Sequence, residues 1–347
     1  MKPSSVHDRV VAVLYQSSPT PSQGGIRKPA KPGGYRDSAA DIAYALRQGG
    51  VSVVTPNSEA DPARDLDWAF GDERDGIKAA LDAGASLLWA NTTLYDGHPL
   101  AEFANNVGVV GQSIALVDRF EDKWVMNQWL RSHQFPVPNM WTLRFLDVVP
   151  TVLPLVLKPR RGRGSQGVQR IVSRNDIPAL APGDKCLDAF VVEEYLPGEE
   201  VTISVMPPGS FVIDNRVRKV SGYWALPPVM RRYHRNGIIP YSGEVPVLDN
   251  SLVDHTSSRA LEQLVSNCEA IAARLYSRAW LRIDARQDPE GVYRIMDVNF
   301  KPNLTGPGRP GRDRDVSLVA MAAASYGWSY SDLVTNLLQS QDWTLPF

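Results

Sequence analysis

Leu281-Arg-Ile-Asp284 and Ile295-Met-Asp-Val-Asn299 are the two stretches that decide the fold of this 347-residue chain. Apolar and polar residues alternate in both, which predicts two short strands whose side chains point to opposite faces in turn. Asp288-Pro-Glu-Gly291 lies between them and consists of residues that strongly favour a turn. The two strands are therefore expected to form a hairpin that gathers polar side chains on one face.

The polar face of this hairpin would consist of Arg282, Asp284, Asp297 and Asn299. Carboxylate and amide oxygens suit magnesium, which takes one or two carboxylates and completes its shell with phosphate oxygens and water. An ordinary solvated sheet face has a similar composition. On these four residues alone, both interpretations stay open.

The composition of the chain excludes several classes of protein. Hydrophobic residues make up 43% of the sequence, which is enough for a sizeable core and too much for a disordered chain. The formal net charge of -1 gives no global field that would attract nucleic acid or an anionic membrane. The two cysteines have no metal or redox spacing, and the first apolar run is too short for a signal or membrane segment. We therefore expect a cytoplasmic protein.

Strands alternate with helices in the first third of the chain. Apolar runs at 10–15, 51–55 and 86–90 are typical of strands, and helical spacing lies between them. This alternation predicts a parallel, helix-covered sheet that ends near Ala115. One helix is expected over 118–133, before the prolines that follow it.

A glycine-rich loop follows the strand predicted over 154–158. Lys158 ends that strand, and the loop from Gly162 to Gly167 carries three glycines and a serine. Glycines let the backbone turn its amides toward an anion, and lysine adds a charge for phosphate. The loop matches neither the P-loop pattern nor the Rossmann fingerprint. An ordinary turn with exposed arginines stays open beside a phosphate site.

A further strand, ending near Leu196, leads into Pro197-Gly198 and the acidic pair Glu199-Glu200. Backbone groups exposed where such a strand ends suit the edge of an adenine, and a carboxylate a few residues later can accept hydrogen bonds from ribose. Acidic strand ends are also typical of plain solvated surface. The segment alone does not separate these interpretations.

The order and spacing of these stretches, with Asp122-Lys123 before them, resemble the ATP-grasp superfamily and, within it, the D-alanine:D-alanine ligases. The resemblance covers residues 10–338 and is densest over 122–302. It implies an α/β (α+β) ATP-grasp fold with an N-terminal parallel-sheet pre-ATP-grasp domain. The expected domains are 1–115, a central ATP-grasp subdomain over 116–200, and a C-terminal subdomain with the metal and substrate site over 201–347.

The resemblance also implies a site for ATP and two magnesium ions, with manganese able to replace magnesium. The residues that would contact the nucleotide are Lys123, Lys158, Gly164, Ser165, Gly167, Glu193, Glu194, Leu196 and Glu200. The metal ligands would be Asp284, Asp297 and Asn299, with Asp297 standing where these ligases usually have glutamate. The catalytic residues would be Arg282, Lys158 and Asn303.

The departures from the ligases fall in the segments that hold substrate. Gly33 to Ser38 is the only counterpart of the segment whose glutamate holds the first D-alanine, with Asp37 in approximately that place. The aromatic and acidic motif of the ligases' central loop is absent, and Asn303 replaces the oxyanion glycine. The resemblance thus implies an ATP-dependent carboxylate–amine ligase, acting through an acyl phosphate, that is not a true D-alanine:D-alanine ligase. An ATP-grasp carboxylase or phosphoryl-transfer enzyme and a non-catalytic nucleotide-binding homologue are the alternatives.

Arginines crowd the two segments that shape the amino-acid pockets of these ligases. Arg231 and Arg232 lie in the first segment, and Arg312 lies in the second. Arginine suits bidentate binding of carboxylate or phosphate, so these residues predict an extra acidic group on one substrate. The alternative is that they are solvated loop charges or face Asp313 and Asp315. The expected partners are an amino acid or acidic substrate and an amine, and a homodimer is one oligomeric state that the resemblance allows.

Overall fold

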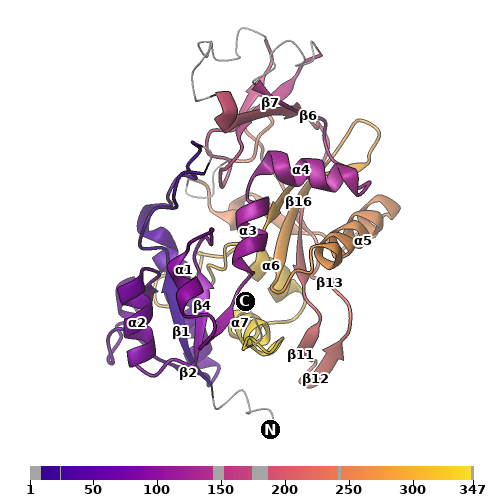
Figure 1. Ribbon diagram of the computed structural model, residues 1–347. Helices are drawn as coiled ribbons and strands as arrows, with labels where there is room; N and C mark the ends of the chain where they lie inside the picture. Colours follow the sequence, from indigo (N-terminus) through magenta and orange to yellow (C-terminus); the bar gives the residue numbers. More distant parts are fainter. Residues whose placement is uncertain (1–8, 24, 144–151, 174–186, 241–243, 345–347) are drawn as a thin grey trace.

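The computed structural model of the protein describes residues 9–23, 25–143, 152–173, 187–240 and 244–344 (Figure 1). A parallel sheet forms the N-terminal part, with strand order β2-β1-β4-β5 and β3 beside β1. Its strands are β1 (Val10–Tyr15), β2 (Ser52–Val53), β3 (Phe70–Gly71), β4 (Leu87–Asn91) and β5 (Gly108–Val110). Two helices pack beside it, α1 (Arg36–Gln48) and α2 (Arg74–Asp82). The prediction of a parallel sheet from the strand–helix alternation is confirmed.

A four-stranded antiparallel sheet forms the upper part of Figure 1, with strand order β6-β9-β7-β8. Its strands are β6 (Met140–Thr142), β7 (Leu155–Pro159), β8 (Gln169–Ile171) and β9 (Phe190–Glu194). A small apolar cluster of its own, which includes Leu155, Leu157 and Val192, holds it together. The sheet therefore has a core separate from the rest of the molecule.

The C-terminal sheet has the strand order β15-β14-β10-β16-β17, with β13 beside β10. Its strands are β10 (Glu200–Met206), β13 (Trp224–Ala225), β14 (Val229–Arg231), β15 (Ser251–Val253), β16 (Leu281–Gln287) and β17 (Tyr293–Asn299). A hairpin and three helices accompany it, β11 (Gly209–Ile213), β12 (Arg216–Val220), α5 (Arg259–Arg274), α6 (Leu318–Ser325) and α7 (Tyr330–Gln339). One large apolar cluster contains Trp89 of β4 together with Trp280 and Leu333, so the first and third sheets share a core.

The hairpin predicted from the sequence is formed by β16 and β17. Arg282 pairs with Asn299 and Asp284 with Asp297, with a register shift just after Asp284. In the connecting turn the backbone N–H of Asp288 donates to Val292 O at 2.9 Å. The four polar side chains are therefore neighbours on adjacent strands, as the alternation predicted.

The single helix expected over 118–133 is wrong. The structure has two helices there, α3 (Ile114–Phe120) and α4 (Lys123–Ser132). Asp122 separates them, because its Oδ1 accepts hydrogen bonds from the backbone N–H of Trp124 at 2.9 Å and of Val125 at 3.3 Å. A carboxylate in this capping position begins a new helix. The break places Lys123 at the first position of α4, where its side chain reaches the hairpin.

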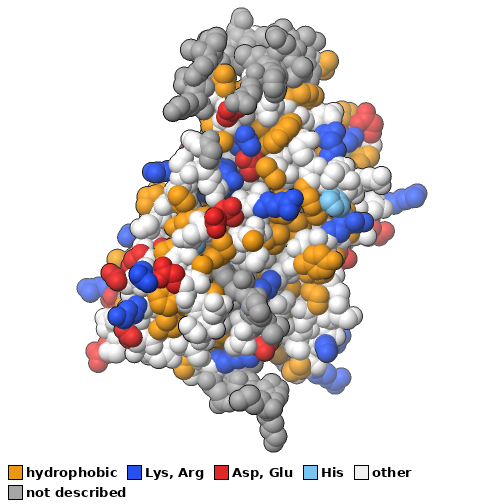
Figure 2. Space-filling model, in the orientation of Figure 1, with side chains coloured by type: hydrophobic (Ala, Val, Ile, Leu, Met, Phe, Trp, Pro, Cys, Tyr) orange, Lys and Arg blue, Asp and Glu red, His pale blue; other side chains and the backbone are white. Residues whose placement is uncertain are grey.

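The surface of the molecule carries mixed charge. On the face shown in Figure 2, cationic and anionic side chains are interspersed among apolar ones. None of the helices in the described part of the chain has the length and apolar character needed to span a bilayer.

Candidate functional site

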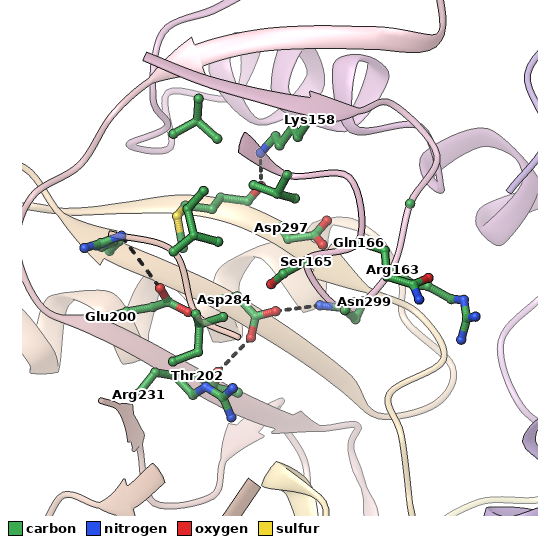
Figure 3. Close-up of a pocket in the computed structure, with 18 of the residues that line it drawn as sticks. Lys158, Arg163, Ser165, Gln166, Glu200, Thr202, Arg231, Asp284, Asp297 and Asn299 are labelled. Carbon is green, nitrogen blue, oxygen red and sulfur yellow. Dashed lines mark hydrogen bonds and ion pairs between the residues drawn. The ribbon is translucent and has the colours of Figure 1, made fainter. Parts of the chain in front are cut away.

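Two adjoining cavities lie where the central sheet, the C-terminal sheet and the N-terminal segment meet. The first, of about 210 Å³, is lined by the glycine-rich loop, the end of β9 and the polar face of the hairpin (Figure 3). The second, of about 500 Å³, lies between the end of β17 and the segment from Lys28 to Asp37. Some residues line both cavities, namely Lys123, Gly162, Arg163, Gly164, Val247, Arg282, Asp297, Asn299 and Asn303. A ligand in one cavity can therefore touch a ligand in the other.

Asp284 is the centre of the hydrogen-bond network on the hairpin face (Figure 3). Its Oδ1 accepts from Thr202 Oγ1 at 2.7 Å and its Oδ2 from Asn299 Nδ2 at 2.9 Å. Arg282 forms a two-pronged pair with it, through Nε at 3.1 Å and Nη2 at 2.9 Å. Because the amide nitrogen of Asn299 is occupied by Asp284, its Oδ1 is the atom left to face a cation.

Two lysines that were predicted to contact phosphate are held by carboxylates. Lys123 Nζ lies 2.7 Å from Asp297 Oδ2, and Lys158 Nζ lies 2.6 Å from Glu193 Oε2. Burial raises the pKa of Asp297, but the opposing effect of Lys123 and Lys158 is larger. The net shift of the pKa is downward, so the carboxylate stays ionised. Burial raises the pKa of Glu193 against the opposing effect of Lys158. The site therefore consists of charge pairs that a polyphosphate and a cation could exchange.

The residues predicted to hold adenine and ribose all line the first cavity. Leu196 is buried, and Glu193 and Glu200 line the cavity beside it. Glu200 Oε2 is 2.8 Å from His234 Nε2, so the carboxylate is already positioned by a neighbour. Glu194 also lines the cavity, while its Oε2 accepts from the backbone N–H of Asn139 at 3.2 Å.

The glycine-rich loop closes one side of the first cavity with Gly164 and Ser165, both of which have positive φ. Gly167 is not among the described residues that line either cavity. Its φ of +72° and the closeness of Pro159 make it a turn residue. Arg163 extends from the loop to the N-terminal segment, where its Nη2 donates to Ala30 O at 2.6 Å and its Nε to Pro29 O at 3.1 Å.

Comparison with known proteins shows the family of the chain. Residues 147–339 match the family described as the D-ala D-ala ligase C-terminus, which is more than half of the chain. The chain belongs to that family. A D-alanine–D-alanine ligase of Chromohalobacter salexigens is 26% identical over 274 residues, covering 77% of this chain and 74% of its own.

Solved structures of several ligases and of a synthetase share the fold. The D-alanine–D-alanine ligase of Bacillus anthracis in complex with ATP matches with a TM-score of 0.65 and 15% identity, over 96% of both chains. The VanG D-Ala:D-Ser ligase of Enterococcus faecalis matches with a TM-score of 0.61 and 13% identity, over 95% of this chain and 98% of its own. The N5-carboxyaminoimidazole ribonucleotide synthetase of Thermotoga maritima matches with a TM-score of 0.56 and 15% identity, over 86% and 70%. The predicted ATP-grasp fold is confirmed, and the relatives are ATP-dependent ligases.

The hairpin face carries oxygen donors of the kind that a hard divalent cation takes. Among the described residues, no group of three or more His, Cys, Asp or Glu side chains is placed to hold a metal. Asp284 and Asp297 supply two carboxylates and Asn299 one amide oxygen, which fits magnesium because that ion needs few protein ligands when phosphates complete its shell. The three residues present therefore fit the ion.

Only some of the residues predicted to bind substrate line a cavity. Asp37 lines the second cavity, with both carboxylate oxygens 2.8 Å from Lys31 Nζ. Burial raises the pKa of Asp37, but Lys31 has the larger opposing effect, so the net shift of the pKa is downward. Arg231 lines the first cavity, is buried and donates to Ser251 Oγ at 2.9 Å. Arg232 is exposed and lies outside both cavities.

Arg312 also lies outside both cavities, because a buried carboxylate elsewhere recruits it. Its Nε is 2.8 Å from Asp41 Oδ1, and its Nη1 is 3.5 Å from Asp315 Oδ2. The fully buried Arg309 shares Asp41 at 2.7 Å. An unpaired buried carboxylate would be costly, so these arginines serve the packing of the loop against α1. This geometry favours the alternative interpretation for Arg312, that it pairs with nearby carboxylates.

Sequence reasoning missed Thr202 and Lys301. Thr202 follows Glu200 with a period of two on β10 and faces Asp284 in the register, so strand alternation contained the signal. Lys301 continues the same period after Asp297 and Asn299, and it lines the second cavity. Burial lowers the pKa of Lys301 well below its usual range, and Lys31 and Lys28 lower it further.

Proposed function

We propose that the protein is an ATP-dependent ligase that joins a carboxylate to an amine through an acyl phosphate. One observation carries the proposal: Arg282, Asp297 and Asn299 line both cavities at their junction. A nucleotide in the first cavity would present its γ-phosphate to a substrate in the second. The sequence predicts phosphate contacts for Lys123, Lys158 and the glycine-rich loop, which is consistent with that orientation of the nucleotide.

In the proposed reaction, a carboxylate oxygen of the substrate attacks the γ-phosphorus of ATP, and the bond from that phosphorus to the bridging oxygen breaks as ADP leaves. The amine nitrogen then attacks the carbonyl carbon of the acyl phosphate, phosphate leaves, and the nitrogen loses a proton. Such chemistry depends on positioning and on neutralising charge. It needs no nucleophilic side chain.

The residues divide the proposed work between binding and charge stabilisation. Lys123 and Lys158 would bind the phosphates, Arg282 would face the phosphoryl group that is transferred, and the Asn303 amide would donate to the oxyanion. Asp284, Asp297 and Asn299 would hold magnesium, which would supply neutralisation of phosphate charge. If phosphates attracted Lys123, its present partner Asp297 would be free to hold the cation.

Asp37 is the feature that argues against D-alanine as the substrate. In the ligases that the sequence resembles, a glutamate near this place holds the first D-alanine. Here Lys31 occupies both oxygens of Asp37. The carboxylate is therefore already compensated and offers little to a substrate ammonium.

The test is a screen of carboxylic acids and amines with ATP and magnesium, read by phosphate release and by product mass. The proposal predicts one amide formed for each phosphate released, dependent on both substrates. Phosphate release that requires bicarbonate, or a phosphorylated product without an amide, would instead support another ATP-grasp reaction. No turnover with any pair, together with ATP binding, would support a nucleotide-binding homologue.

A further inference from the structure

Lys301 is a buried amine on the wall of the second cavity, facing the segment that precedes α1. Its Nζ lies 3.0 Å from the centroid of the Tyr35 ring. Among the residues that the structure describes, this atom has no hydrogen-bond partner. A lysine amine carries several donor hydrogens, and leaving them unmet away from water is costly. The aromatic ring attracts the cation but cannot satisfy these donors.

The backbone around Tyr35, whose ring contacts Lys301, has an unusual conformation. Tyr35 ends a 3-10 helix, Pro32–Tyr35, in which Gly33 and Gly34 both have positive φ. Tyr35 itself has a φ of +65°, which is unfavourable for a bulky residue. Strain of this kind persists where the surroundings require it, often at ligand sites. Lys31 also faces the ring, at 4.9 Å from its centroid, so two cations converge there.

Most carboxylates that line the second cavity already have a cationic partner, Asp297 in Lys123 and Asp315 in Arg312 among them. Glu121 binds Lys28 with both oxygens at 2.7 Å, and Asp37 binds Lys31 in the same way at 2.8 Å. Glu244 also lines the cavity, but it is exposed. Lys301 has positive charge beside it, and no carboxylate of the described residues forms a hydrogen bond with its Nζ. The cavity therefore favours an anion and disfavours an ammonium.

The position of Lys301 relates this anion preference to the reacting centre. It lies two residues beyond Asn299, so the two Cα atoms are at most about 7 Å apart. A short acid could place one carboxylate at the junction of the cavities, beside Asn299 and Arg282, and a second charged group near Lys301. Both ends of such a substrate would lie within the same cavity.

We propose that the second cavity binds a carboxylic acid that carries a second anionic group, a carboxylate or a phosphate, which pairs with Lys301. This inference rests on the proposed function, because it names the class of the carboxylate substrate. Lys31 and Lys28 contribute to the field but remain paired with Asp37 and Glu121. The amino group of an amino acid has no comparable partner in the described part of this cavity.

The test is a set of acids of matched size that differ at the far end: butanoate, succinate, 3-phosphonopropanoate and 4-aminobutanoate. Calorimetry measures their dissociation constants with magnesium and a non-hydrolysable ATP analogue present. We expect at least one anionic-ended probe to bind at least about tenfold more tightly than butanoate, the factor for one charge-assisted hydrogen bond. Succinate and phosphonopropanoate together identify which anion the site takes. Equal binding of all four acids by the wild type would overturn the inference.

Substitutions then assign the effect to the lysine. Lys301→Met keeps the apolar stem over Tyr35 and should remove the advantage of the anionic probes while leaving butanoate and the ATP analogue unchanged. Lys301→Arg should keep most of it, and Lys78→Met, an exposed lysine on α2, should keep all of it. An unchanged advantage in Lys301→Met would overturn the assignment. The wild-type series needs no variant, so it decides the question even if Lys301→Met fails to fold.

The binding and turnover results separate this inference from the proposed function. Selective binding of the anionic acids without amide formation from any acid would contradict the proposed function and leave the inference intact. Amide formation from butanoate or D-alanine as efficient as from succinate and phosphonopropanoate would support the proposed function and overturn the inference.

Discussion

The two cavities meet at Asn299, yet they balance charge in different ways. In the first cavity the cations at the junction and the phosphate end, Lys123, Lys158 and Arg282, each have a carboxylate within 3 Å, in the pairs with Asp297, Glu193 and Asp284. In the second cavity Lys301 has no such partner among the described residues. A paired site can exchange partners when a triphosphate and a dication enter together, because those ligands bring both signs of charge. An unpaired lysine instead favours a ligand with negative charge only. The first cavity thus suits a ligand common to many ligases, and the second suits a particular substrate.

The largest expected effect comes from removing a carboxylate at the junction. Asp297→Ala should lower turnover by at least about 100-fold, the cost of losing one preorganised charge-stabilising group. Steady-state rates at saturating magnesium measure it, and Asn299→Ala should behave similarly. Asp313→Ala, at an exposed carboxylate, is the matched control. Near-normal rates for Asp297→Ala would remove the metal assignment.

A second prediction uses the pairing itself in the first cavity. Lys158→Met should weaken binding of an ATP analogue by about tenfold or more and also destabilise the fold, because it leaves Glu193 buried without its partner. Adding Glu193→Gln should restore much of the stability, since it removes the orphaned carboxylate, but not the ATP affinity. Chemical denaturation and calorimetry measure the two quantities. Recovery of both together would show that Lys158 acts only through the fold.

A third prediction concerns the preference of the second cavity for an anionic over a cationic ligand group. Lys31→Met frees Asp37 from its ion pair, so the cavity loses a cation and gains an available carboxylate. The affinity ratio of 4-aminobutanoate to succinate should rise by about fivefold or more, by the scale of one ion-pair contact. The same calorimetric series measures it, with Lys78→Met as the control. An unchanged ratio would mean that Asp37 does not face the ligand.

The smallest expected effect concerns the contact between the glycine-rich loop and the N-terminal segment. Arg163→Ala should raise the apparent dissociation constant of the ATP analogue only a few-fold, because the interactions lost are two hydrogen bonds to backbone carbonyls. Limited proteolysis gives a second measure, since cleavage at residues 160–167 should slow when the analogue is bound. Equal cleavage with and without the analogue would argue against closure of the loop.

The sequence predicted the parts of the site that follow from local periodicity. Alternation alone placed Arg282, Asp284, Asp297 and Asn299 on one face, and the register agrees. Pairing with residues distant in the sequence was beyond its reach. Arg312 resembled a substrate residue until the fold brought it to Asp41, 271 positions away. The break at Asp122 was missed because a carboxylate within an apolar helical pattern resembles an exposed helix residue as much as a cap.

The contact of Arg163 with Pro29 and Ala30 has a consequence for kinetics. The loop that we propose to cover the nucleotide touches the chain segment that continues into the wall of the second cavity through Lys31 and Tyr35. If closing the loop and filling the second cavity favour the same position of that segment, each ligand tightens the other by one common factor, since coupling between two sites is reciprocal. ATP would then be poorly enclosed until an acid is present. Such coupling would limit hydrolysis of ATP by water when no acid is bound.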